Sequence, residues 1–189
     1  MASVSLLPAV FPVPIAKDGR PAKISDGFDL NSRGGSGHPG ADIMYRRAVC
    51  GAKDNLPTQS RCFEMPNGVP ALALAAGKVI ISKEIGTGGY IMIQHPQLNL
   101  QSQYMHLRGR RVKVGETVKT GQVIGDISHN PSGYRLNHLH FQLRNMSGNL
   151  QNPGAFLAKL QQVSAPFTFG LQEAILVAGA VAIAAWFIL

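Results

Sequence analysis

Apolar and polar residues alternate in short runs through most of the chain, between about residue 24 and residue 144. Glycine-rich turns separate these runs, which cover residues 69–86, 88–96, 100–107, 112–127 and 138–144. Alternation with a period of two, interrupted by glycine and proline, is typical of β-strands joined by tight turns. No long heptad-like apolar stretch precedes residue 171, so we predict a domain that is mainly β.

The segments around this region have other patterns. Residues 1–23 are apolar and proline-containing but lack a basic start, which predicts an extended arm instead of a cleaved secretory signal. Residues 43–68 predict a long inserted loop, and residues 155–163 a short amphipathic helix after an Asn-Pro-Gly sequence. The predicted organisation is an N-terminal arm (1–23), a folded domain (24–158), a linker (159–170) and a C-terminal segment (171–189).

The C-terminal segment carries no polar side chain from residue 174 to residue 189. As a helix this run would be about 24 Å long, slightly short of the roughly 30 Å hydrocarbon core of a bilayer unless Leu171 and its neighbours join it. Trp186 suits an interfacial anchor, and a stripe of alanines at 174, 178 and 182 would permit helix–helix association. We predict a transmembrane anchor at 171–189; the alternative is a helix buried in a larger assembly.

The net charge of +8 indicates attraction to polyanions, which include nucleic acid, anionic lipid and cell-wall polymers. The basic residues are scattered in small groups without interleaved aromatic residues, so we predict no nucleic-acid partner. Cys50 and Cys62 lie in the polar inserted loop and lack the paired spacing of a structural zinc site. A disulfide and two free thiols both remain open at this point.

Four of the six histidines fall in three short motifs. These motifs are GHPGADI at 37–43, QYMHL at 103–107 and NHLHFQL at 137–143. Residues two apart in a strand face the same side at a separation of about 7 Å, so His138 and His140 can serve one site. One of the two can bind a metal while the other meets the substrate.

His38 and Asp42 lie four residues apart, with a proline and a glycine between them. That spacing favours a turn that folds the imidazole and the carboxylate together. With His140 they form a set of two imidazoles and one carboxylate, which is the three-ligand set that leaves zinc an open position for water. The set is typical of a catalytic zinc site, not a structural one.

The HPGAD, YMHL, VKVGETVKTGQVIG and HLHF sequences, in this order, resemble the M23 family of zinc metallopeptidases of the lysostaphin or LytM type. The resemblance runs from about residue 24 to residue 157 and implies an antiparallel β-sheet domain. It implies that one zinc ion per chain is bound by His38, Asp42 and His140. It also implies that His106 and His138 lie beside the attacking water.

Other histidines and an aromatic residue have simpler interpretations. His95 ends an apolar strand and is expected to be structural, and His129 is expected to be a solvated loop residue. Tyr104 either reaches the substrate or packs in the core. The VKVGETVKTGQVIG stretch is also similar to the half-barrel of lipoyl and biotinyl carriers, but no lysine occupies a hairpin tip in that pattern.

The resemblance implies an endopeptidase that hydrolyses the peptide crosslinks of bacterial peptidoglycan. Basic residues near the site, Arg108, Arg110 or Arg135, would favour substrates with carboxylates, such as D-Ala to diaminopimelate crosslinks. The alternative is a structural membrane protein that binds the cell wall through a non-catalytic M23-like domain.

The expected location follows from the single apolar span. All lysine and arginine residues precede it, so a simple charge rule would leave the enzyme on the cytoplasmic side, away from peptidoglycan. We therefore predict that the enzyme resides in the virion membrane of a lipid-containing bacteriophage, with other virion proteins as partners, and serves wall penetration or lysis. The alternative is a bacterial inner-membrane enzyme that faces the periplasm.

Overall fold

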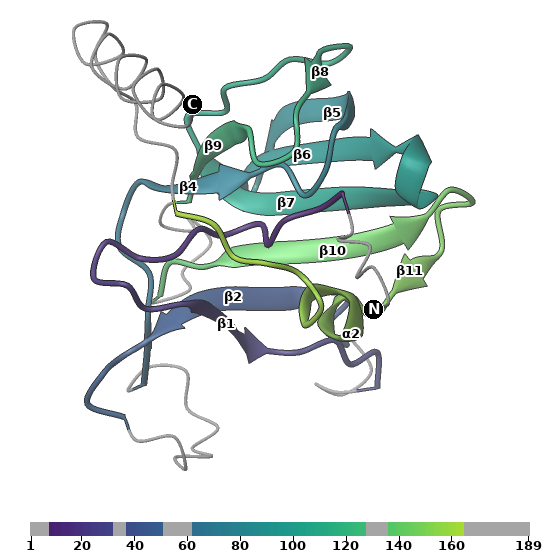
Figure 1. Cartoon of the computed structure of the whole chain (residues 1–189). Helices are drawn as coiled ribbons and strands as arrows, with labels where there is room; N and C mark the ends of the chain where they lie inside the picture. Colours follow the sequence, from purple (N-terminus) through teal and green to yellow (C-terminus); the bar gives the residue numbers. More distant parts are fainter. Residues whose placement is uncertain (1–7, 32–36, 51–61, 128–135, 165–189) are drawn as a thin grey trace, which may run out of the picture.

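The computed structural model of the chain describes residues 8–31, 37–50, 62–127 and 136–164. These residues form one connected antiparallel sheet (Figure 1). The prediction of a mainly β domain is therefore confirmed.

The strands are β1 (Ala22–Asp26), β2 (Ala41–Arg46), β3 (Phe63–Glu64), β4 (Val69–Leu72), β5 (Gly77–Ile85), β6 (Gly88–His95), β7 (Leu100–Arg108), β8 (Thr117–Val118), β9 (Val123–Ile127), β10 (Leu139–Asn145) and β11 (Leu150–Gln151). A 3-10 helix, η2 (Pro96–Leu98), follows β6, and a short α-helix, α2 (Pro153–Leu157), follows β11.

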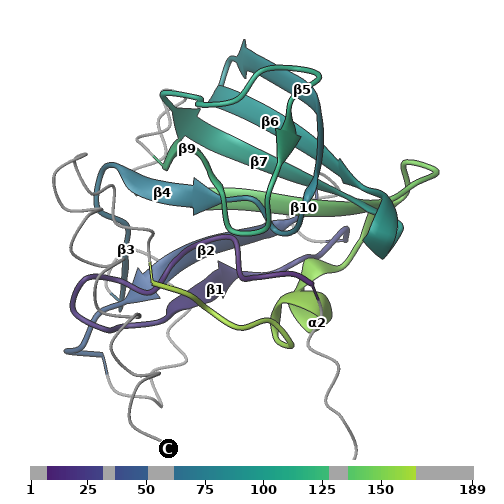
Figure 2. The same cartoon turned by 45° about the horizontal axis from the view of Figure 1, so that its top comes forward.

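The order of strands in the sheet differs from their order in the chain. The main path is β1-β2-β10-β7-β6-β5-β8, with β9 paired to β4 and β7. In Figure 2, β10 crosses the middle, with β1 and β2 on one side of it and β5, β6 and β7 on the other. β10 therefore joins the first strands of the domain to the later hairpins.

The core follows from the alternation along the strands. β6 alternates buried and half-buried residues along its whole length, which buries Ile91 and Ile93. On β10, Leu139, Phe141 and Leu143 enter the hydrophobic core. Successive side chains of a strand point to opposite faces, so the residues between them, including His140, lie on the other face of β10.

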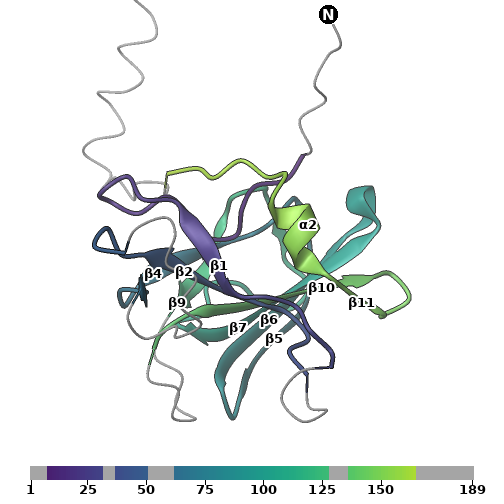
Figure 3. The same ribbon diagram turned by 90° about the horizontal axis from the view of Figure 1, so that it is seen from below.

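The N-terminal arm is extended from residue 8 and packs against the domain. Phe11 and Val13 are buried in the core, and Val10 and Ile15 form parallel bridges with Gln161 and Ser164. Figure 3 shows the arm and the segment after α2 running together on one side of the sheet. The predicted boundary between residues 23 and 24 falls inside β1.

Two predicted elements are wrong in their extent. The inserted loop is shorter than 43–68, because β2 continues to Arg46 and pairs with β3. The helix predicted at 155–163 ends at Leu157, since the residues after it run along the arm instead of continuing the helix.

Cys50 and Cys62 form a disulfide with a Cα–Cα distance of 5.5 Å. The pairing answers the question that their spacing left open. The bridge links the end of the turn after β2 to the residue before β3, so it closes the base of the inserted loop.

Within the described ranges, no helix is long and apolar enough to span a membrane. The anchor predicted at 171–189 lies outside the described residues.

Candidate functional site

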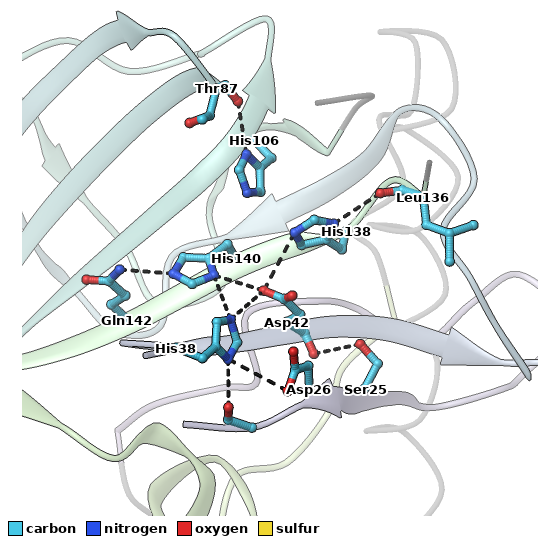
Figure 4. A network of polar contacts seen from close by, with 11 residues as sticks. Ser25, Asp26, His38, Asp42, Thr87, His106, Leu136, His138, His140 and Gln142 are labelled. Atoms are coloured by element: carbon cyan, nitrogen blue, oxygen red, sulfur yellow. Dashed lines mark hydrogen bonds and ion pairs between the residues drawn. The ribbon is translucent and has the colours of Figure 1, made fainter. Parts of the chain in front are cut away.

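The strand order brings the three histidine motifs together. β10 pairs with β2 on one side and with β7 on the other, and His140 lies opposite Asp42 in the first pairing and opposite Met105 in the second. The five predicted site residues therefore gather over three neighbouring strands, as Figure 4 shows. All five are buried, with exposed fractions of at most 9%.

His38, Asp42 and His140 present three ligand atoms to one another. His38 Nε2 lies 3.1 Å from Asp42 Oδ1 and 3.2 Å from His140 Nδ1, and the last two atoms are 2.8 Å apart. Within the described ranges, these three residues form the group whose ligand atoms could hold a metal ion. The predicted ligand set is thus assembled in space.

The chemistry of these atoms fits a metal ion. For a tetrahedral zinc ion with ligands at about 2.0–2.1 Å, neighbouring ligand atoms lie roughly 3.3 Å apart, which is close to the separations found here. His38 Nδ1 donates a hydrogen bond to the Gly27 carbonyl oxygen at 2.6 Å, so in the neutral ring the Nε2 lone pair faces Asp42. A cation, either a proton or a metal ion, is needed between these atoms.

The electrostatics agree with that need. Burial by itself would raise the pKa of Asp42, but hydrogen bonds from His140 and His38 outweigh it and hold the pKa well below the usual carboxyl range. The hydrogen bond to Asp42 raises the pKa of His38. Asp42 is therefore a permanent anion in the site, which favours a bound cation.

Gly40 leaves the space in which His140 lies. A Cβ atom at this position would come within 2.9 Å of His140 Nε2 and Gln142 Cγ and within 2.5 Å of the Phe141 carbonyl oxygen. The glycine of the HPGAD motif is therefore required because β2 and β10 approach closely here.

Gly40→Ala should reduce the free energy of unfolding by about 1–3 kcal/mol and weaken metal binding, since the ring of His140 must move. Denaturant unfolding and competition with a chromophoric zinc chelator measure the two effects. Gly86→Ala is the matched control, because a Cβ there meets nothing within 4 Å. Equal stability and affinity of the two variants would contradict this account of Gly40.

His106 reaches the site through an unusual backbone conformation. Its φ is 63°, a left-handed value that costs a residue with a side chain on the order of 1–3 kcal/mol. The β6–β7 pairing shifts register between Gly89 and Ile91 at this point, and such irregularities re-aim a side chain. The His106 ring lies 4.6 Å from that of His138 and 6.0 Å from that of His140.

Backbone carbonyl groups orient the two outer histidines. His106 Nδ1 donates to the Thr87 carbonyl oxygen at 2.9 Å, and His138 Nδ1 to that of Leu136 at 3.1 Å (Figure 4). In a neutral ring this leaves Nε2 unprotonated and able to accept a proton. Burial lowers the pKa of His106 to about 4, so this ring is neutral near pH 7. His138 Nε2 lies 3.6 Å from Asp42 Oδ1, beside the ligand set.

The family model of Peptidase family M23 matches residues 58–153, just over half of the chain. The chain belongs to peptidase family M23. The matched stretch contains His106, His138 and His140 but begins after His38 and Asp42. The pairing of β2 with β10 nevertheless brings those two residues beside His140.

Several M23 relatives cover part of the chain. An "uncharacterized metalloprotease" of Buchnera aphidicola is 40% identical over 93 residues, which are 48% of this chain and 24% of that protein. The peptidoglycan DD-endopeptidase ShyA of Vibrio cholerae is 34% identical over 88 residues, 46% of this chain and 20% of that protein. The chain thus spans a quarter or less of these curated relatives.

Among solved structures, the catalytic domain of lysostaphin from Staphylococcus simulans aligns with a TM-score of 0.52 and 26% identity. The alignment covers 75% of this chain and 94% of that domain. The lysostaphin-type M23 fold implied by the sequence motifs is therefore confirmed.

The remaining candidate residues are either part of the buried interior or lie outside the described residues. His95 is fully buried between the Ala76 carbonyl oxygen and the Ser102 hydroxyl, as a structural histidine would be. Tyr104 packs on the Phe141 ring and accepts a hydrogen bond from the Leu74 amide, so it belongs to the core. His129 and Arg135 lie outside the described residues.

The sequence patterns did not single out three groups that contact His38, His140 and His106. Asp26 Oδ1 lies 4.0 Å from His38 Nδ1, and the amide of Gln142 lies 2.9 Å from His140 Nε2. Gln142 could have been found, because it continues the period of two from His138 and His140. The Thr87 carbonyl could not have been found, because every residue type has a backbone carbonyl group and the sequence does not show which one accepts a hydrogen bond from His106.

Proposed function

We propose that this chain is a zinc-dependent endopeptidase that hydrolyses the peptide crosslinks of bacterial peptidoglycan. The observation that carries the proposal is the buried His38–Asp42–His140 set with His106 and His138 beside it, on the sheet of an M23 peptidase. The names of two relatives support the substrate, since ShyA is a peptidoglycan DD-endopeptidase and lysostaphin an antimicrobial peptidase.

Zinc suits this site because two imidazoles and one carboxylate are the ligands that leave it an open position. When bound, it lowers the pKa of water and polarises the scissile carbonyl. His38 and His140 would hold the ion through ring nitrogen atoms and Asp42 through a carboxylate oxygen, and the charge of Asp42 would offset part of that of the ion. One ion is expected per chain.

His106 and His138 supply the proton transfers. Each ring, when neutral, has an unprotonated Nε2, because its Nδ1 donates to a backbone carbonyl. Such a ring can accept a proton from the attacking water and, once charged, donate to the oxyanion or to the leaving amine. All five side chains lie together, which favours hydrolysis over the alternative of a non-catalytic wall-binding protein.

We propose that the bond cleaved is the D-Ala to diaminopimelate crosslink. Arg110 is engaged by Glu84 at 2.9 Å, whereas Arg108 is exposed at the end of β7, two residues beyond His106. The exposed position of Arg108 supports it as the residue that would meet a substrate carboxylate.

Digestion of purified Gram-negative peptidoglycan followed by mass spectrometry tests this function. The expected result is conversion of crosslinked dimers to monomers with intact glycan strands. Cleavage of pentaglycine alone would contradict the bond assignment, and release of sugar fragments would contradict a peptidase.

We propose further that residues 171–189 anchor the enzyme in the virion membrane of a lipid-containing phage. The support is the apolar sequence of residues 174–189. Recovery of the protein from membranes of bacteria that carry no phage or prophage would contradict a virion location and favour the bacterial inner membrane.

A further inference from the structure

Gln142 is a buried polar side chain beside the metal ligands. It lies on the same face of β10 as His140, and its exposed fraction is 5%. Its amide nitrogen is 2.9 Å from His140 Nε2, the ring nitrogen that faces away from Asp42 (Figure 4). A Cβ atom at Gly40 would come within 2.9 Å of Gln142 Cγ, so the glycine at this position leaves the space that the Gln142 side chain occupies.

The contact has a consequence for the proton on His140. A neutral imidazole carries one proton, on either Nδ1 or Nε2. With the Gln142 amide nitrogen as donor, Nε2 must accept, so the proton is on Nδ1 and points to Asp42 Oδ1 at 2.8 Å. Both hydrogen bonds are satisfied in this arrangement, but Nδ1 then has no lone pair for a metal ion.

Metal binding through Nδ1 of His140 requires the opposite tautomer. The proton must lie on Nε2, which then needs an acceptor in the same place. A half-turn of the amide of Gln142 presents its oxygen there, because the two amide ends are nearly equal in size. Glutamine can therefore serve both tautomers, whereas glutamate accepts only and methionine does neither.

We propose that Gln142 is a positioning residue for the metal site: rotation of its amide selects the His140 tautomer that can bind the ion. This inference rests on the proposed metal site. Partners of this kind hold the ring nitrogen of a metal ligand, and their loss typically weakens metal affinity about 10–100-fold.

The first test is the tautomer of His140 in the metal-free full chain. Long-range 1H–15N correlation spectra in detergent micelles, with the His140 signals identified by their loss in His140→Ala, report which nitrogen is protonated. We expect Nε2 to be unprotonated in the wild type and protonated in Gln142→Glu, where the carboxylate accepts. A protonated Nε2 in the metal-free wild type, or an unprotonated one in Gln142→Glu, would overturn the inference.

The second test is zinc affinity, measured by competition with a chromophoric chelator. Gln142→Met should bind zinc about 10–100-fold more weakly, and Gln142→Glu at least as tightly as the wild type. Gln94→Met, a half-buried glutamine on β6, is the matched control and should be unchanged. Equal affinity of Gln142→Met and wild type would refute the role of Gln142; if that variant does not fold, the result for Gln142→Glu and the tautomer decide.

These outcomes separate the inference from the proposed function. A wild type that binds zinc but leaves peptidoglycan intact would refute the function and spare the role of Gln142. A wild type that binds no zinc would refute both.

Discussion

Replacing His106 or His138 by alanine should leave one zinc ion bound per chain and lower kcat by about 10²- to 10⁴-fold, the usual contribution of a general acid or base. Neither ring belongs to the group of close ligand atoms, and both have Nδ1 engaged by a backbone carbonyl. Zinc content by elemental analysis and the rate of conversion of crosslinked muropeptide dimers measure the two properties.

His140→Ala is the matched comparison for these two variants, because it also removes one imidazole from the same face of the sheet but takes away a proposed zinc ligand. It should lose both zinc and activity. If His106→Ala or His138→Ala also fails to hold zinc while remaining folded, the division between ligands and proton carriers is wrong.

Removal of the metal should abolish hydrolysis altogether. We expect excess chelator to stop the reaction and one equivalent of zinc per chain to restore it, since the bound ion is the group that would polarise the scissile carbonyl and activate the water. Asp42→Asn should reproduce the loss, because a neutral amide replaces the buried anion that His38 and His140 approach. Zinc affinity should fall by more than about 100-fold, beyond the range for outer partners.

Asp126→Asn is the matched control for Asp42→Asn. Asp126 is a carboxylate on β9 paired with Arg111 at 2.8 Å, and it is not part of the ligand set. Its replacement should leave zinc affinity and hydrolysis unchanged.

Full hydrolysis in excess chelator would show that the reaction does not need the metal.

The sequence alone determined which residue types the site uses. His38 and Asp42, and likewise His138 and His140, are close neighbours in the chain, so their local geometry follows from short-range preferences: a proline–glycine turn in the first case and the two-residue period of a strand in the second. The alternation of apolar residues was enough to predict strands, because successive side chains of a half-buried strand point alternately to the core and to the solvent, so apolar residues recur at every second position.

Only the tertiary structure decided how these pieces meet. His38 and His140 are 102 residues apart, and nothing in either motif states that β10 lies between β2 and β7. The spacing of Cys50 and Cys62 left their pairing open, and the helix predicted at 155–163 was wrong beyond Leu157, because pairing with a distant segment outweighs local preference. The tautomers of His106 and His140 depend on the Thr87 carbonyl and the Gln142 amide, since a ring proton goes to whichever nitrogen finds an acceptor once the strands have come together.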